Sequence, residues 1–149
     1  MESIFDISAN KKLIDRVNKL SPKSKPEWGK MKVSQMLVHC KIPIQSAFGD
    51  IKIKREFAGI LFGRIAKKML SGDKPFKKNL PTNKAFQISN DPDLKEEKQK
   101  LLKLIRRFIE AGPNGITKQP HPFFGNLTTQ EWDNMMWKHL DHHLRQFGV

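Results

Sequence analysis

DPDLKEEKQKLLKLIRRFIEAGP, residues 91–113, contains the start, the apolar face and the stop of one amphipathic helix. Asp91 is the expected N-cap, Pro92 fits the first helical position, and Gly112 with Pro113 ends the pattern. The apolar face consists of Leu94, Leu101, Leu102, Ile105, Phe108 and Ile109. Such a face must be covered by other elements, so we expect this helix to pack into a core.

Two earlier segments repeat this helical spacing of apolar residues. Residues 8–20 form an expected helix with Ser8 as its N-cap, and residues 33–48 form a second one that contains Pro43. Proline cannot donate a hydrogen bond to the carbonyl four residues back, which belongs to His39. We therefore expect a bend beside that histidine.

Two further helices complete the pattern. Residues 55–71 form an expected helix that stops at Gly72, and the last helix begins where Thr128 and Glu131 stand at capping-box spacing. No convincing period-2 alternation predicts a sheet. The sequence predicts an all-α fold, an antiparallel bundle of four or five helices, in a single domain of residues 1–149. In residues 55–71 the helical spacing is carried by Phe57, Ile60, Leu61, Ile65 and Met69.

Composition favours anionic partners. The chain has 28 Lys and Arg against 15 Asp and Glu, a net charge of +13. Its single cysteine, Cys40, excludes an internal disulfide, and the first residues do not resemble a secretory leader, so we expect a cytoplasmic protein. The apolar stretch FAGILFG is far shorter than the roughly 18 residues of a membrane span.

The ending HLDHHLRQFGV, residues 139–149, concentrates three of the five histidines. At 100° per residue, His139 and His143 lie one turn apart on the same face as Trp132 and Gln146. Two histidines at this spacing can bind one metal ion, as in other two-histidine sites. His142 points about 100° away from His143 and is a substitute ligand at most.

Two interpretations of this ending stay open. Cationic side chains are favoured in the last turn of a helix, so these histidines also fit simple stabilisation of the helix end. His39, at the border of an apolar helix beside Met36 and Pro43, shifts the balance toward a metal. A buried imidazole needs a partner, which a metal ion or a backbone carbonyl can supply.

Four other residues have alternative roles. His121, in the loop QPHPFFG, is a candidate catalytic proton carrier or fourth ligand, although a turn residue is the favoured interpretation. Gln146 can orient a ligand or cap the last carbonyls, and Trp132 can line the metal cavity or fill the core. Cys40 points away from His39 and is expected to be a buried filler.

The order of these residues resembles a known family. Trp28, then His39, then HLDHHLRQ with His139, His143 and Gln146 is similar to the DinB-like, or YfiT-like, four-helix-bundle metalloproteins. The ending HPFFGNLTTQEW to KHLDHHLRQFGV resembles a subfamily of that group without an assigned function. The resemblance runs from about residue 28 to the end.

The resemblance implies a fold and a site. The fold is an up-down-down-up bundle in which His39, His139 and His143 hold one divalent ion. Members include thiol-dependent transferases, and hydrolases are also suggested. Two departures stand out: residues 51–90 insert an extra helical segment between the second and third helices, and the absence of tyrosine removes a usual pocket residue.

Three neutral histidines would leave a divalent ion its charge and open positions, so a bound water or thiol would lose its proton near neutral pH. We expect a thiol transferase with a low-molecular-weight thiol cosubstrate and a small anionic substrate. A hydrolase is second, because no glutamate stands in a His-Glu-x-x-His arrangement to act as base. Imidazole suits zinc, nickel and iron alike.

A binding module without chemistry is the rival hypothesis. The basic run from Arg55 to Lys84 contains interleaved phenylalanines and would suit nucleic acid or an anionic membrane surface. No helix-turn-helix or zinc-finger spacing supports nucleic-acid binding. We rank the binding module below the metal site. No feature of the sequence supports or opposes a homodimer. The interleaved residues are Phe57, Phe62, Phe76 and Phe86.

Overall fold

The computed structural model describes residues 1–55, 57–72, 74–80 and 86–149. Within these residues the chain forms five α-helices and no β-strand, as the sequence predicted. An isolated bridge pairs His121 with Gly125. The α-helices are α1 (Ile7–Lys19), α2 (Val33–Ala47), α3 (Phe57–Ala66), α4 (Leu94–Ala111) and α5 (Thr129–Gln146), with 3-10 turns η1 (Lys67–Leu70) and η3 (Pro113–Gly115).

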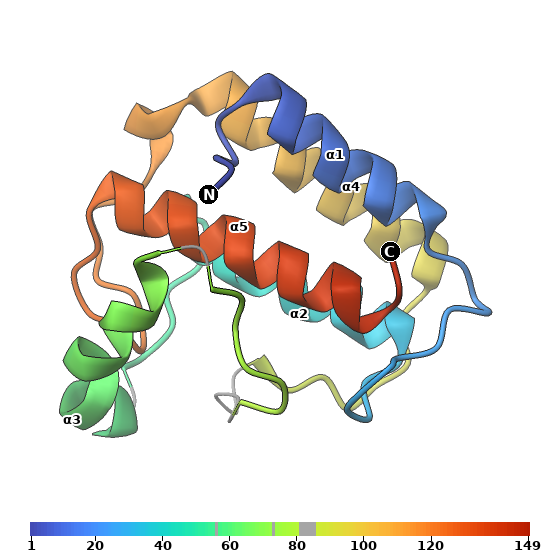
Figure 1. The fold of residues 1–149 in the computed structure, drawn as a ribbon, viewed down its shortest axis with the longest axis horizontal. Helices are drawn as coiled ribbons and strands as arrows, with labels where there is room; N and C mark the ends of the chain where they lie inside the picture. The colour runs from blue at the N-terminus through green and yellow to red at the C-terminus, as the bar shows by residue number, and fades with distance from the viewer. Residues whose placement is uncertain (56, 73, 81–85) are drawn as a thin grey trace.

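Four of the helices share one core. α1 packs against α4 and α5, and α2 packs against α4 and α5, whereas α3 lies at the periphery (Figure 1). Large side chains from all four core helices are almost completely buried. The first helix, α1, and the last helix, α5, both contribute to this core. The largest buried members on these helices are Trp132, Phe108, Leu13, Met36, Leu37, Ile44, Leu101, Ile105, Met136 and Leu140.

Two helix starts differ from the sequence prediction by two residues. Asp6, and not Ser8, caps α1, and Ser8 donates its hydroxyl to the Asp6 carboxylate. Asp93, and not Asp91, caps α4 by accepting from the backbone of its first turn. Asp91 instead accepts from the hydroxyl of Ser34 on α2, and so ties the start of α4 to a neighbouring helix. In both places the helix is capped by an aspartate two residues away from the expected cap.

The start of α5 is as predicted. Thr128 accepts from the backbone of Glu131, and Glu131 accepts from the backbone of Thr128, which completes the capping box. α2 runs through Pro43 as one helix, and a bend beside His39 stays a prediction.

The segment predicted as a helix over residues 55–71 is divided and faces outward. α3 ends at Ala66, and η1 follows it. The buried residues of α3 are Gly59 and Gly63, while the apolar side chains at helical spacing are exposed. Lys84, the end of the predicted basic run, lies outside the described residues. In the part of the chain that is described, no helix has the length and apolarity needed to cross a membrane.

Candidate metal centre

Three histidines from two helices meet inside the molecule. His39 comes from α2, and His139 and His143 come from successive turns of α5, which packs against α2. Each offers one ring nitrogen, and these three nitrogens lie within 4.8 Å of one another. The structure thus brings together the three residues that the sequence named as metal ligands, and such a cluster can hold a metal ion.

Hydrogen bonds fix which nitrogen of two rings carries the proton. Nδ1 of His39 lies 2.9 Å from the carbonyl oxygen of Phe86, which can only accept. Nδ1 of His143 lies 2.8 Å from Oε1 of Gln146, whose amide nitrogen donates to the carbonyl of Trp28 at 2.7 Å. Both Nδ1 atoms are therefore donors, and both Nε2 atoms carry a lone pair.

His139 completes the convergence. Its Nε2 lies 3.0 Å from Nε2 of His39, whose lone pair points toward it. Its Nδ1 is buried and has no hydrogen-bond partner among the described residues. Two arrangements satisfy this geometry: His139 donates a proton to His39, or both lone pairs point to one shared cation. The second arrangement is the one a metal ion requires.

Burial keeps these imidazoles neutral. It lowers the pKa of His39, and it lowers the pKa of His143 to about 3, with the charge of neighbouring histidines adding to the effect for His143. The pKa of His139 is also well below its usual value, first because of burial and then because of the adjacent histidines. Neutral imidazole is the form that binds metals, so no proton has to be removed near pH 7.

His142 does not belong to the cluster. Its ring lies edge-on to Trp28, with centroids 5.5 Å apart, and 6.3 Å from the ring of Phe76. It is half-buried on the neighbouring face of α5. The role of substitute ligand therefore has no support in this geometry.

His121 occupies a turn. Its Nδ1 accepts from the backbone N–H groups of Phe123 and Phe124, at 3.0 and 3.1 Å. The side chain is buried, burial lowers its pKa to about 3, and its ring lies 5.3 Å from that of Trp132. Of the three roles the sequence left open, these contacts support the turn residue. His121 is not part of the three-histidine cluster, and a catalytic role stays untested.

The contacts of Gln146 and Trp132 support different roles for these two residues. Gln146 orients His143, one of its two expected roles. Trp132 is 1% exposed, its ring contacts His121, and its Nε1 has no hydrogen-bond partner among the described residues. These contacts place it in the core.

Cys40 is also buried, beside the sulfur of Met36, and burial raises the pKa of its thiol, so the expectation of a filler is confirmed.

The carbonyl of Phe86 is the functional group that sequence reasoning missed. It orients His39, and its residue lies in the loop before α4. No sequence signal could have found it, because every residue has a carbonyl and only the path of the loop decides which one approaches the ring.

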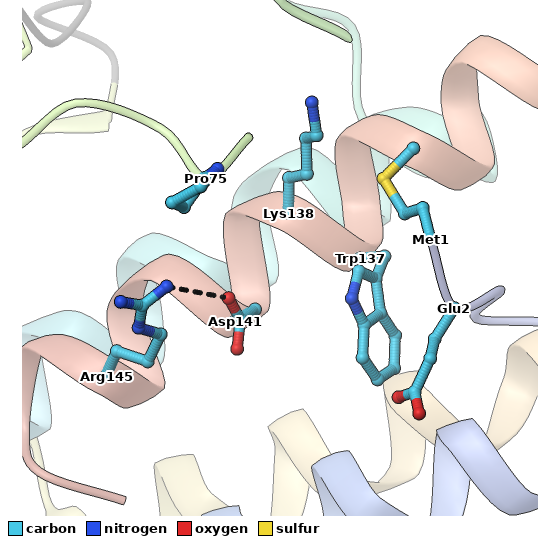
Figure 2. Close-up of a pocket in the computed structure, with 7 residues that line it drawn as sticks. All are labelled: Met1, Glu2, Pro75, Trp137, Lys138, Asp141 and Arg145. Atoms are coloured by element: carbon cyan, nitrogen blue, oxygen red, sulfur yellow. Dashed lines mark ion pairs between the residues drawn. The ribbon is translucent and has the colours of Figure 1, made fainter. Parts of the chain in front are cut away.

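A separate hollow of about 390 Å³ opens on the other side of α5 (Figure 2). Trp137 and Asp141 in its wall lie on the helix face opposite to His139 and His143. A guanidinium nitrogen of Arg145 lies 3.8 Å from a carboxylate oxygen of Asp141 in the same wall. The hollow is therefore not the access route to the histidine cluster. It is lined by Met1, Glu2, Pro75, Trp137, Lys138, Asp141 and Arg145.

Comparison with known families gives one result. The profile of the family described as Protein of unknown function (DUF1569) matches residues 3–148. The chain belongs to this family. No curated protein and no solved structure matches it. The match covers all three histidines of the cluster, and the family description names no activity.

Proposed function

We propose that His39, His139 and His143 bind one divalent metal ion through their Nε2 atoms, and that this ion serves an enzyme related in chemistry to thiol transferases. The convergence of the three nitrogens within 4.8 Å carries the proposal. The fixed protons on Nδ1 of His39 and His143 support it, because they leave the converging nitrogens free to bind.

The protein contributes neutral ligands in a buried position. An ion held by three of them keeps its full charge and lowers the pKa of a water or thiol that binds beside it. The carbonyl of Phe86 and the amide of Gln146 hold two of the rings in place. The net charge of +13 favours an anionic cosubstrate such as a thiol with carboxylates. Zinc, nickel and iron all suit this ligand set.

Thiol transfer ranks above hydrolysis because of the composition of the cluster. Among the described residues the cluster consists of histidines, without a carboxylate to serve as general base for a water. A thiol starts from a pKa of about 8.5, far below that of water, so it would need no such base when bound to the ion. The resemblance to DinB-like proteins supports the same order, and we extend the proposal to their up-down-down-up arrangement of α1, α2, α4 and α5. The pairing of α1 with α4 and of α2 with α5 agrees with it.

Elemental analysis of protein purified without a tag or chelator tests the metal site. We expect about one metal ion per chain in the unmodified protein and almost none in His139→Ala. His142→Ala is the matched control, since it removes the same side chain from the same helix and should keep the metal. Equal metal content in His139→Ala and His142→Ala would end the proposal.

An activity assay tests the chemistry. The metal-loaded protein is incubated with low-molecular-weight thiols and a carbon electrophile, and loss of free thiol is followed. We expect turnover that His139→Ala abolishes. Hydrolysis of ester or amide substrates without thiol consumption would favour the hydrolase instead, and metal binding without either reaction would overturn the enzymatic part.

A further inference from the structure

α3 presents an apolar surface that the molecule itself does not cover. Phe57 is 78% exposed, Ile65 is 69% exposed and Ile60 is 59% exposed. Leu61 and Phe62 are more than half exposed as well. Large apolar side chains gathered on one short helix are unusual on a protein surface and mark a binding surface for another body. We call these five residues the α3 patch.

The other side of α3 is fixed to the protein by two glycines. Gly59 and Gly63 lie one turn apart and contact the backbone of Phe123, so close that a Cβ atom at either position would collide with it. This contact turns the small face of the helix inward and the large side chains outward. The exposure of the α3 patch is therefore a consequence of how the helix is attached.

The surroundings of the α3 patch are strongly basic. Residues 51–90 contain ten Lys and Arg against two Asp and Glu. Most of these basic residues are exposed, and they lie before α3, on α3, on η1 or in the loop that follows η1. The exposed ones in the described residues are Lys52, Lys54, Arg55, Arg64, Lys68, Lys74, Lys77 and Lys78.

We infer that α3 docks onto an anionic lipid bilayer, with the α3 patch in the boundary between headgroups and acyl chains and the basic residues on the headgroups. A ten-residue helix is about 15 Å long, which suits a helix that lies in the interface and does not cross it. Each basic residue near such a surface adds to the electrostatic attraction.

Charge and chemistry select this partner over two others. A second copy of the chain would bring a second set of the same positive charges against the first, which opposes association through the α3 patch. Nucleic acid would satisfy the charge, but it offers no apolar medium for Phe57, Ile60 or Ile65. A lipid surface supplies negative charge and an apolar layer together.

Insertion can be measured with a dye at one position. The Phe62→Cys variant is labelled with an environment-sensitive fluorophore, which should react at position 62 alone because Cys40, the single native cysteine, is buried. We expect a blue shift and stronger emission with vesicles of phosphatidylcholine and phosphatidylserine, and little change with phosphatidylcholine alone. The same dye at Ile7→Cys, which is 73% exposed on α1, should not respond. Equal responses at both positions would refute docking through α3.

Matched polar substitutions complete the test. Ile65→Asn should weaken vesicle binding at least about 10-fold, since an asparagine side chain gains nothing from the apolar layer, whereas Ile7→Asn should bind as the unmodified protein does. Binding that high salt removes but Ile65→Asn leaves unchanged would overturn the inference. So would a dimer, measured by light scattering, that Ile65→Asn dissociates in the absence of vesicle binding. Neither variant should change the metal content, so this test is independent of the metal proposal.

Discussion

Gln146 connects the imidazole of His143 to the backbone of Trp28, and so links the candidate metal centre to the loop before α2. In Gln146→Leu, Nδ1 of His143 loses its acceptor and the ring can rotate. Groups that orient a metal-binding histidine typically contribute about 10- to 100-fold to metal affinity. We expect a loss of that size in Gln146→Leu, measured by competition with a chromophoric chelator.

Gln146→Glu is the control for that prediction. A carboxylate oxygen can still accept from Nδ1, although it cannot donate to Trp28. We expect most of the affinity to be kept. Equal losses in Gln146→Glu and Gln146→Leu would mean that the contact with Trp28, and not the orientation of His143, matters.

His121 makes a separate prediction about pH. Burial lowers its pKa to about 3, whereas an unfolded chain has its usual value near 6.5. As the pH falls below 6.5 the unfolded state takes up a proton first, so this residue reduces stability by about 2 kcal/mol between pH 7 and pH 5. In His121→Gln the free energy of unfolding should fall by that much less over this range.

Denaturant unfolding of both proteins at pH 7 and pH 5, in the presence of a chelator, gives the two differences. The comparison uses the change in the free energy of unfolding between pH 7 and pH 5. The free energy at a single pH is not compared, because His121→Gln also changes the turn with Phe123 and Phe124. The same pH dependence in both proteins would show that His121 is not buried in its neutral form.

At the scale of single residues, the sequence predicted what periodicity and spacing control. His139 and His143 follow from helical spacing, and their approach to His39 follows only from the packing of α2 on α5. The displaced cap at Asp93 and the carbonyl of Phe86 depend on which polar groups come close after folding. Sequence neighbours carry no information about such contacts.

α3 shows the limit of periodicity at the scale of an element. Its apolar residues predicted a helix correctly, but the spacing does not say which side of a helix faces inward. Here two glycines decide the orientation, since only a face without side chains can approach the backbone of Phe123 so closely. In α5, by contrast, the capping box and the buried face agree, and the start of the helix at Thr128 was predicted correctly.

The glycine contact makes a prediction with a definite sign. In an exposed helix, replacing Gly by Ala stabilises by roughly 0.5–1 kcal/mol. Gly63→Ala should do the opposite, because its new methyl group would collide with the carbonyl of Phe123 and separate α3 from the loop. We expect faster hydrogen exchange in residues 57–66 of Gly63→Ala.

Hydrogen exchange resolved by peptide mass spectrometry provides the readout for α3. Exchange in α5, which lies on the core, should change little, and this serves as an internal control. Slower exchange in α3 of Gly63→Ala would mean that helix propensity outweighs the contact, and that the helix is not held as described.

At the scale of the whole molecule, the all-α fold was predictable because four segments have apolar residues at helical spacing, and these residues form the core. Burying those faces together leaves few arrangements, and any of them brings α2 near α5 or α4. The placement of Phe86 was not predictable, since the sequence between η1 and α4 shows no helical periodicity. That segment nevertheless supplies the carbonyl of Phe86 that orients His39, so part of the candidate site lay beyond sequence reasoning.

A metal ion bound by the three histidines would also stabilise the folded state. His39 and His143 belong to segments about a hundred residues apart, and a shared ion would join α2 to α5 at the centre of the molecule. Ligands that bind only the folded state stabilise it, by about 2.7 kcal/mol when their concentration is 100 times Kd. A metal here would therefore serve structure as well as chemistry.

Anomalous diffraction from crystals of the metal-loaded protein, recorded above and below the absorption edge of the bound element, would locate the ion. We predict one strong peak within bonding distance of the Nε2 atoms of His39, His139 and His143, and no such peak in His139→Ala crystals. Crystals of metal-treated protein without a peak between α2 and α5, or with a peak bound to other residues, would contradict the proposed centre.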